Sequence, residues 1–190
     1  GLLHALDAQS GRERWAFMPW DRLPRMLALY RNAAVQPRSS LGLDGTLRVL
    51  KLDHDGDGIV EAAAGDRVIL YFGMRRGGQR YYAVDVTAVH PGADPAGDAP
   101  ELLWIAGPAN DAAIPADRRL PLIGQTWSRP VITRLRVPGN EGNGDRVALF
   151  AGGYDTQQDS PDGRPRPYAD AAIGTGVYAL DALTGQLLWR

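Results

Sequence analysis

Residues 176–189 read GVYALDALTGQLLW, and this segment decides the fold that the sequence predicts. Its first half alternates apolar and small residues, an Asp and a Gly flank the middle, and a Trp closes it. Such alternation predicts a β-strand, and the Asp and Gly predict a tight turn to a second strand. We expect Asp181 to accept backbone N–H bonds across the turn and Gly185 to adopt a positive φ. Trp189 would pack against a neighbouring unit.

The same pattern occurs twice more in the chain. It appears as LLHALDAQSGRERW at 2–15 and as RYYAVDVTA at 80–88, which reaches its Trp only at position 104. The longer excursion of the second copy is rich in Pro, Gly and Ala, which predicts neither helix nor strand there. The equivalent residues are Asp7, Gly11 and Trp15 in the first copy and Asp85 and Trp104 in the second.

Further strands precede each of the last two copies. GDRVILYFGM (65–74) parallels GDRVALFAGGY (144–154), and LRVLKLD (47–53) and RPVITRLRV (129–137) come before them. Four-stranded units that repeat with a signature Trp are typical of β-propeller blades. The sequence therefore predicts an all-β fold, a single β-propeller domain of about two and a half blades. Its predicted parts are the last two strands of one blade (1–17), an inserted helix (19–33), a second blade (41–104) and a third (126–189).

The segment PWDRLPRMLALYRNA (19–33) departs from the strand pattern. Its apolar residues Leu23, Met26, Leu27 and Tyr30 recur at helical spacing, and Asp21 precedes them as a candidate cap. We expect a short helix between blades. An apolar stripe of this kind usually belongs to the core, so we expect it to be packed and not to form a ligand groove.

Residues 53–61, DHDGDGIVE, place four carboxylates within nine residues. Like charges so close together repel one another unless a cation cancels them. The pattern D-x-D-x-D-G suits a hard cation, because alternate side chains curl inward and the Gly permits a sharp turn. Oxygen-only ligands favour Ca²⁺. The predicted ligands are Asp53, Asp55, Asp57, the carbonyl of Ile59 and Glu61.

This loop differs from a full twelve-residue EF-hand loop, because Ala64 stands where the closing Glu would be. Glu61 would then supply the closing carboxylate, with Asp66 too far along to be an obvious substitute. The missing ligand predicts a dissociation constant of roughly 10⁻⁶–10⁻⁴ M. The alternative is a solvated Asp/Gly turn that binds nothing.

Other polar groups give weaker signals. The loop PGNEGNGDR (138–146) is a degenerate relative with Glu141 and Asp145 as its acids, and the four aspartates of 154–170 fit solvated turns. The remaining candidate side chains share no metal-ligand spacing and no nucleophile context: His4, His54, His90, Ser39 and Ser40. Because we find no catalytic constellation, we expect a protein that is not an enzyme.

The composition excludes some classes of protein and disfavours others. The net charge is −1 with scattered basic residues, which does not favour nucleic acid as a partner. The sequence has no apolar run long enough for a membrane span. It has no cysteine, which excludes thiol catalysis and disulfides within these residues. The opening GLLHALDAQSG looks like the middle of a unit, so we expect a piece of a longer protein.

The Asp-turn-Trp repeat resembles the motif of quinoprotein-like, or modified, β-propellers. The order of segments is more specific: LLHALDAQSGRERWAFMPWDRLPRML, GDRVILYFGMRRGGQRYYAVDVT, GQTWSRPVITRL, VALFAGGYD and VYALDALTG. In this order they resemble the C-terminal propeller of the PilC/PilY family of type IV pilus-tip proteins, over most of the chain.

That resemblance implies a propeller exposed at the pilus tip or the outer surface, exported through the periplasm, with pilins or minor pilins and host or abiotic surfaces as partners. It also implies a nine-residue calcium loop whose occupancy affects pilus biogenesis, twitching motility and adhesion, carried here by Asp53, Asp55, Asp57, Ile59 and Glu61. Glu61 stands where Asp is usual in the family, and no RGD tripeptide is present. The alternatives are a fragment of a pyrroloquinoline-quinone-dependent dehydrogenase and a non-catalytic outer-membrane assembly scaffold.

Overall fold

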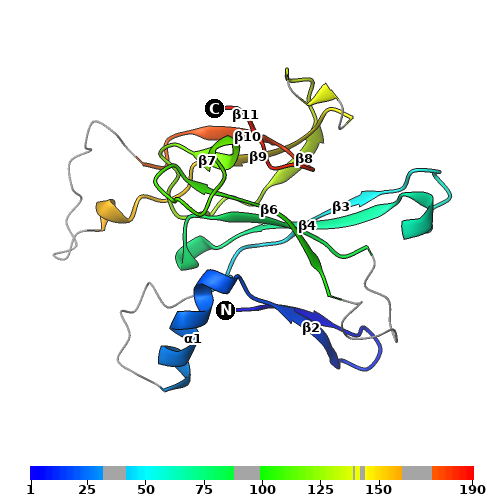
Figure 1. Cartoon of the computed structure of the whole chain (residues 1–190), viewed down its shortest axis with the longest axis horizontal. Helices are drawn as coiled ribbons and strands as arrows, with labels where there is room; N and C mark the ends of the chain where they lie inside the picture. The colour runs from blue at the N-terminus through cyan, green and yellow to red at the C-terminus, as the bar shows by residue number, and fades with distance from the viewer. Residues whose placement is uncertain (32–41, 88–98, 139, 142–143, 160–172) are drawn as a thin grey trace.

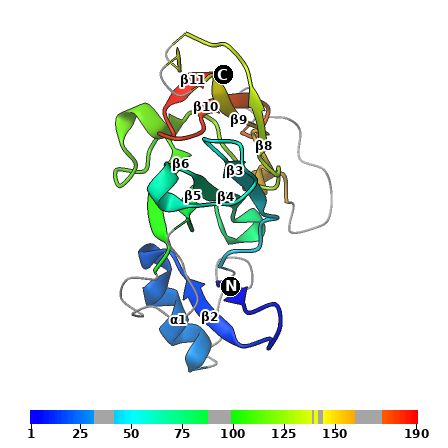
Figure 2. The same cartoon turned by 90° about the vertical axis from the view of Figure 1, so that its right-hand side faces the viewer.

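In the part of the chain that the structure describes, three β-sheets follow one another, from an N-terminal hairpin to a C-terminal sheet (Figures 1 and 2). The structure is a computed structural model that describes residues 1–31, 42–87, 99–138, 140–141, 144–159 and 173–190. The hairpin and the helix lie at the end that holds the N-terminus, and the C-terminal sheet lies at the opposite end (Figures 1 and 2). The prediction of an all-β fold is confirmed.

The strands have the following bounds. The first sheet pairs β1 (Leu3–Leu6) with β2 (Glu13–Phe17). The second has the order β3 (Arg48–Leu52), β4 (Arg67–Gly73), β5 (Tyr81–Asp85), β6 (Glu101–Pro108) and β7 (Arg119–Leu120). The third has the order β11 (Leu187–Trp189), β10 (Val177–Asp181), β9 (Arg146–Ala151) and β8 (Val131–Arg134). All pairs are antiparallel except β6 with β7, a short parallel pair that the sequence did not predict.

The helical elements are short. The α-helix α1 covers Leu23–Tyr30. Single 3-10 turns lie at Trp20–Arg22, Ala62–Ala64, Arg75–Gly77, Ala116–Arg118 and Thr156–Gln158. Among the described residues, no helix has the length and apolar character needed to cross a membrane.

The two central strands of the middle sheet, β4 and β5, have buried side chains on both faces of the sheet. Successive residues of a strand point to opposite sides, so the two faces can pack against different neighbours. One face of β4 and β5, with Tyr71 and Tyr81, packs against Phe150 and Tyr178 of the third sheet. The other face, with Phe72 and Tyr82, packs against the hairpin residues Leu3 and Phe17. Two hydrophobic cores therefore join the three sheets in chain order.

The predicted Asp turns are present at the ends of these strands. Oδ1 of Asp181 accepts the N–H groups of Leu183 and Thr184 at 2.9 and 2.8 Å. Asp7 accepts the N–H groups of Gln9 and Ser10, and Asp85 accepts that of Thr87. Gly11 and Gly185 have φ angles of 71° and 76°, as predicted.

Trp104 of β6 lies against the turn that joins β10 to β11. Its Nε1–H donates to the carbonyl of Ala182 at 2.9 Å, and the hydroxyl of Tyr71 donates to the same oxygen at 3.0 Å. A Cβ on Gly185 would lie 2.6 Å from the Trp104 ring, so the ring leaves room only for glycine there. The prediction that this Trp packs against a neighbouring unit is confirmed, whereas the equivalent Trp189 is exposed.

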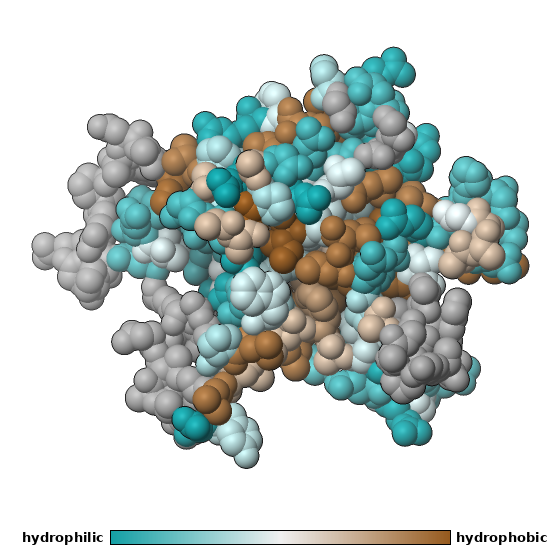
Figure 3. All heavy atoms as spheres, viewed as in Figure 1, coloured by the Kyte–Doolittle hydropathy of each residue, from teal (hydrophilic) through white to brown (hydrophobic). Residues whose placement is uncertain are grey.

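Helix α1 forms inside the predicted range, but its predicted burial is wrong. The side chains of Leu23, Leu27 and Tyr30 are 57%, 50% and 88% exposed, and apolar side chains gather at the surface over this end of the molecule (Figure 3). The described sheets do not cover that side of the helix. Asp21 does not act as the predicted side-chain cap: its Oδ1 is buried without a hydrogen-bond partner, and its Oδ2 pairs with Arg22 at 3.1 Å and Arg80 at 2.8 Å.

Several predictions lie outside the described residues. They concern Ser39, Ser40, His90, most of the excursion before Trp104 and most of 154–170. The ranges 41–104 and 126–189 contain β3–β6 and β8–β11, and their assignment to blades of one propeller stays a prediction.

Candidate metal centre

The acidic loop joins β3 to β4 and extends beyond the ends of these two strands (Figure 1). It leaves β3 at Leu52, turns through two glycines, and returns through the 3-10 turn Ala62–Ala64. Gly56 and Gly58 have φ angles of 78° and 87°, a region that glycine adopts without steric cost. The sequence D-G-D-G thus provides the tight curvature that brings alternate side chains to the inner side of the loop.

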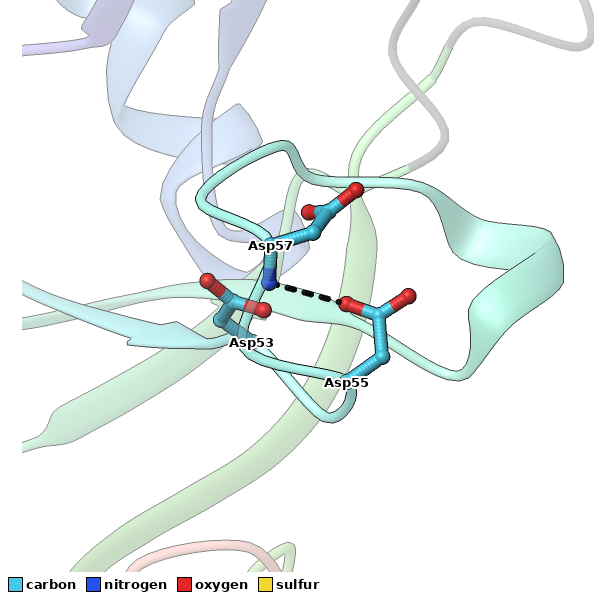
Figure 4. A group of neighbouring side chains, drawn as sticks. All are labelled: Asp53, Asp55 and Asp57. Carbon is cyan, nitrogen blue, oxygen red and sulfur yellow. Dashed lines mark hydrogen bonds between the residues drawn. The ribbon is translucent and has the colours of Figure 1, made fainter.

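Three of the predicted ligands meet at this loop. One carboxylate oxygen from each of Asp53, Asp55 and Asp57 lies within 4.8 Å of the others, and the three side chains gather in one turn of the chain (Figure 4). Within the described residues, this is the one group of three or more His or acidic side chains with ligand atoms so close. Such an arrangement of hard oxygens suits Ca²⁺.

Backbone N–H groups hold these carboxylates in place. Asp53 accepts the N–H of Gly56 at 2.7 Å on Oδ1 and that of Gly58 at 2.9 Å on Oδ2. Asp57 accepts the N–H of Ile59 at 2.7 Å, and Asp55 that of Asp57 at 3.3 Å (Figure 4). An ionised carboxylate has about four lone-pair sites, so each keeps acceptor capacity for a cation.

The remaining predicted ligands lie further along the loop. The side chains of Ile59 and Glu61 are exposed, and the carboxylate of Glu61 is not a member of the close group of three. Their role as ligands therefore stays a prediction. Lys51 of β3 donates from Nζ to the carbonyl of Gly58 at 2.6 Å, which places one positive charge beside the loop.

Asp66, the residue before β4, ties the two ends of the loop together. Its side chain accepts the N–H of His54 at 2.7 Å on Oδ1 and that of Glu61 at 2.9 Å on Oδ2. These two bonds lower the pKa of Asp66 below its ordinary value, because they stabilise the ionised carboxylate. From the sequence, Asp66 was considered only as a ligand, so this role was missed. Its one signal in the sequence is an Asp that closely follows the loop.

The other candidates are placed as follows. His54 is exposed at the second position of the loop, and His4 pairs with Glu13 across the first hairpin at 2.5 Å between Nδ1 and Oε2. In the degenerate loop, residues 139, 142 and 143 lie outside the described residues. There, Asp145 is partly exposed and lies 3.7 Å from Arg136, so it pairs with an exposed side chain.

A second polar region lies at the opposite ends of β4 and β5. A cavity of about 510 Å³ is lined by side chains that include Arg22, Arg76 and Arg80. Arg80 pairs with both Asp21 and Asp111, at 2.8 and 2.5 Å. Because these acids neutralise Arg80, we interpret this network as a structural tie between the 3-10 turn Trp20–Arg22, which precedes α1, and the middle sheet.

Comparison with solved structures finds a similar fold. The chain is similar to the solved C-terminal domain of Pseudomonas aeruginosa PilY1, with a TM-score of 0.50 and 22% sequence identity. The match covers 98% of this chain and 27% of that chain, so this chain spans about a quarter of its length. No family model and no curated protein matches the chain. The resemblance inferred from the order of segments is confirmed at the level of the fold.

Proposed function

We propose that this chain is the calcium-binding, non-enzymatic β-propeller part of a type IV pilus-associated protein. One observation carries this proposal: three inward-turned aspartates occur on a loop of a fold like that of the PilY1 C-terminal domain. The fold likeness supports the association with the pilus, and the carboxylate group supports calcium.

The propeller arrangement is supported by how the sheets meet. Each sheet packs its face against the next in chain order, and Trp104 of one sheet donates to the closing turn of the following sheet. Propellers repeat such face-to-face contacts around a central axis. We therefore assign the middle and C-terminal sheets to two adjacent blades and the hairpin to part of a third.

Calcium would be held by Asp53, Asp55 and Asp57, with the carbonyl of Ile59 and Glu61 completing the ligand set. When bound, the ion cancels the repulsion among carboxylates that lie within 4.8 Å of one another. At ~1 mM Ca²⁺ and a dissociation constant near 10 µM, binding stabilises the folded state by about 2.7 kcal/mol. This free energy is enough to hold one loop conformation.

The functional consequence follows from the place of the loop. The loop projects beyond the ends of β3 and β4, and the side chains of Asp55, Asp57 and Glu61 are exposed, so cation binding changes the charge of this surface. We propose that the surface contacts pilins, minor pilins or a host or abiotic surface outside the cell, and that calcium adjusts pilus biogenesis, twitching motility and adhesion through it.

The test uses the full parent protein in its own cells. Asp55→Asn with Asp57→Asn should change twitching and pilus number in calcium-containing medium, while Glu141→Gln in the degenerate loop should leave both as in the wild type. Normal pili and normal twitching in cells that lack the protein altogether would overturn the association with the pilus. A double variant that behaves as the wild type would overturn the calcium mechanism alone.

A further inference from the structure

The carboxylate of Asp66 is the most buried acidic group near the loop. Asp66 is 2% exposed, whereas Asp55 and Asp57 are exposed. A buried charge needs strong hydrogen-bond partners, because it has lost its contact with water. Asp66 has two such partners, at opposite ends of the acidic segment: the N–H groups of His54 and Glu61.

The chain is shaped to bring Asp66 to this position. The 3-10 turn Ala62–Ala64 ends at Gly65, whose φ of 85° reverses the backbone. The N–H groups of Ala64 and Asp66 both donate to the carbonyl of Glu61, at 3.0 and 3.3 Å. This turn brings the Asp66 side chain back to the loop that precedes it in the sequence, within hydrogen-bond distance of residues 54 and 61.

Both oxygens of Asp66 are engaged by backbone donors, and Asp66 is not a member of the close group of three aspartates. Its geometry is therefore that of a support for the ligands and not of a ligand. Fixing residues 54 and 61 at one point removes loop freedom that ion binding would otherwise have to remove. A loop ordered in advance binds its ion more tightly.

We propose that Asp66 is a positioning residue for the calcium site: it fixes both ends of the 53–61 loop and so raises calcium affinity without contacting the ion. This inference rests on the proposed calcium function. The residue at the equivalent position of the other sheet, Asp145, shares the local sequence Gly-Asp-Arg but pairs with exposed Arg136. It therefore offers a matched control.

The experiment is calorimetric titration of CaCl₂ into three forms of the chain: wild type, Asp66→Asn and Asp145→Asn. The asparagine variant keeps the size of Asp66 but turns an NH₂ group toward a backbone N–H. The inference predicts that Asp66→Asn weakens calcium binding by about 10- to 100-fold with unchanged stoichiometry, as losses of such supporting contacts do. Asp145→Asn should bind calcium within about twofold of the wild type, because it lies outside the ligand support.

The outcomes separate the two proposals. Absence of binding to the wild type would overturn the calcium function and this inference with it. Wild-type binding together with unchanged affinity in Asp66→Asn would overturn this inference alone, even if that variant melted at a lower temperature, because a merely structural role lowers stability and leaves affinity unchanged.

If the Asp66→Asn variant does not fold, a second measurement on the wild-type protein still tests the inference. In wild-type protein kept free of metal by EDTA, the amide hydrogens of His54 and Glu61 should exchange at least about tenfold more slowly than in an unfolded chain. Exchange at unfolded-chain rates would show that Asp66 does not hold the loop before the ion binds, and would overturn the inference.

Discussion

The segment Gly-Asp-Arg ends the first connection of both larger sheets, at 65–67 and at 144–146, yet its Asp has a different role in each. Asp66 is buried and accepts two backbone N–H groups from the acidic loop. Asp145 is partly exposed, has a φ of 57°, and pairs with Arg136. Identical local sequence therefore does not determine the role of the carboxylate.

A buried amide closes the second connection. Asn140 is 1% exposed; its Oδ1 accepts the N–H of Val137 at 3.3 Å, and its Nδ2 donates to the carbonyl of Leu135 at 3.2 Å. An amide can satisfy one donor and one acceptor, whereas a carboxylate suits two donors. In each connection the buried side chain matches the backbone groups that it contacts: the Asp66 carboxylate accepts two N–H groups, and the Asn140 amide accepts one N–H and donates to one carbonyl.

The contact between Trp104 of the middle sheet and the turn at Gly185 of the C-terminal sheet should matter most for stability. Gly185→Ala should lower the free energy of unfolding by about 3 kcal/mol, because it adds left-handed strain and a clash with Trp104. Gly11→Ala is the matched control, since a Cβ there has no atom within 4 Å; it should cost about 1 kcal/mol. Urea unfolding measures both. Equal losses would contradict the role assigned to Trp104.

The next effect is the change in stability when calcium is removed, which should depend on the 53–61 loop and not on the 138–146 loop. Removing calcium with EDTA should lower the stability of the wild type by about 2.7 kcal/mol if calcium was present at about 100 times its dissociation constant. The Asp55→Asn, Asp57→Asn variant should show no such difference, and Glu141→Gln should show the wild-type difference. Thermal unfolding with and without EDTA checks this. A metal response that survives in the double variant would locate the site elsewhere.

A smaller effect tests Asn140, the uncharged buried side chain that closes the 138–146 loop. Asn140→Asp should lower the free energy of unfolding at neutral pH by about 2 kcal/mol, because a buried carboxylate oxygen would then face the Leu135 carbonyl. Chemical unfolding measures the change, with Asp145→Asn as the control on the exposed side of the same loop. A variant as stable as the wild type would show that the two supports are interchangeable.

The smallest effect concerns Asp85, which ends β5. Burial raises its pKa, but hydrogen bonds from Thr87 and Arg67 outweigh burial, so the net pKa is lowered. A lowered pKa stabilises the fold above the ordinary value near 4, and this stability is lost as the pH falls through the folded-state pKa. Arg67→Gln should therefore cost about 1 kcal/mol at neutral pH and less in acid. Urea unfolding at several pH values tests this; a pH-independent cost would contradict it, and Arg48→Gln serves as the control.

The strands and turns could be predicted because they depend on local chemistry. RYYAVDV and VYALD were predictable as strands because they are short and mostly apolar, although β5 and β10 are buried on both faces and not on alternate residues. The Asp turns depend on hydrogen bonds within two or three residues. The group of Asp53, Asp55 and Asp57 was predictable for the same reason, since glycines between them fix a local curvature.

The features that sequence reasoning missed depend on contacts between distant segments. Asp21 was expected to cap a helix but pairs with Arg80, 59 positions away, as their residue numbers show. The apolar stripe of α1 was expected to be buried, and only the arrangement of the sheets decides that it is exposed. Asp66 was missed because its donors are backbone groups, which leave no trace in residue type.

The most direct test of calcium binding is a calorimetric titration of CaCl₂ into the wild-type chain and into Asp55→Asn, Asp57→Asn. We predict one site per wild-type chain with a dissociation constant of roughly 10⁻⁶–10⁻⁴ M, and no binding heat in the variant. Absence of heat in the wild type, or equal heat in both proteins, would contradict a calcium site in the 53–61 loop.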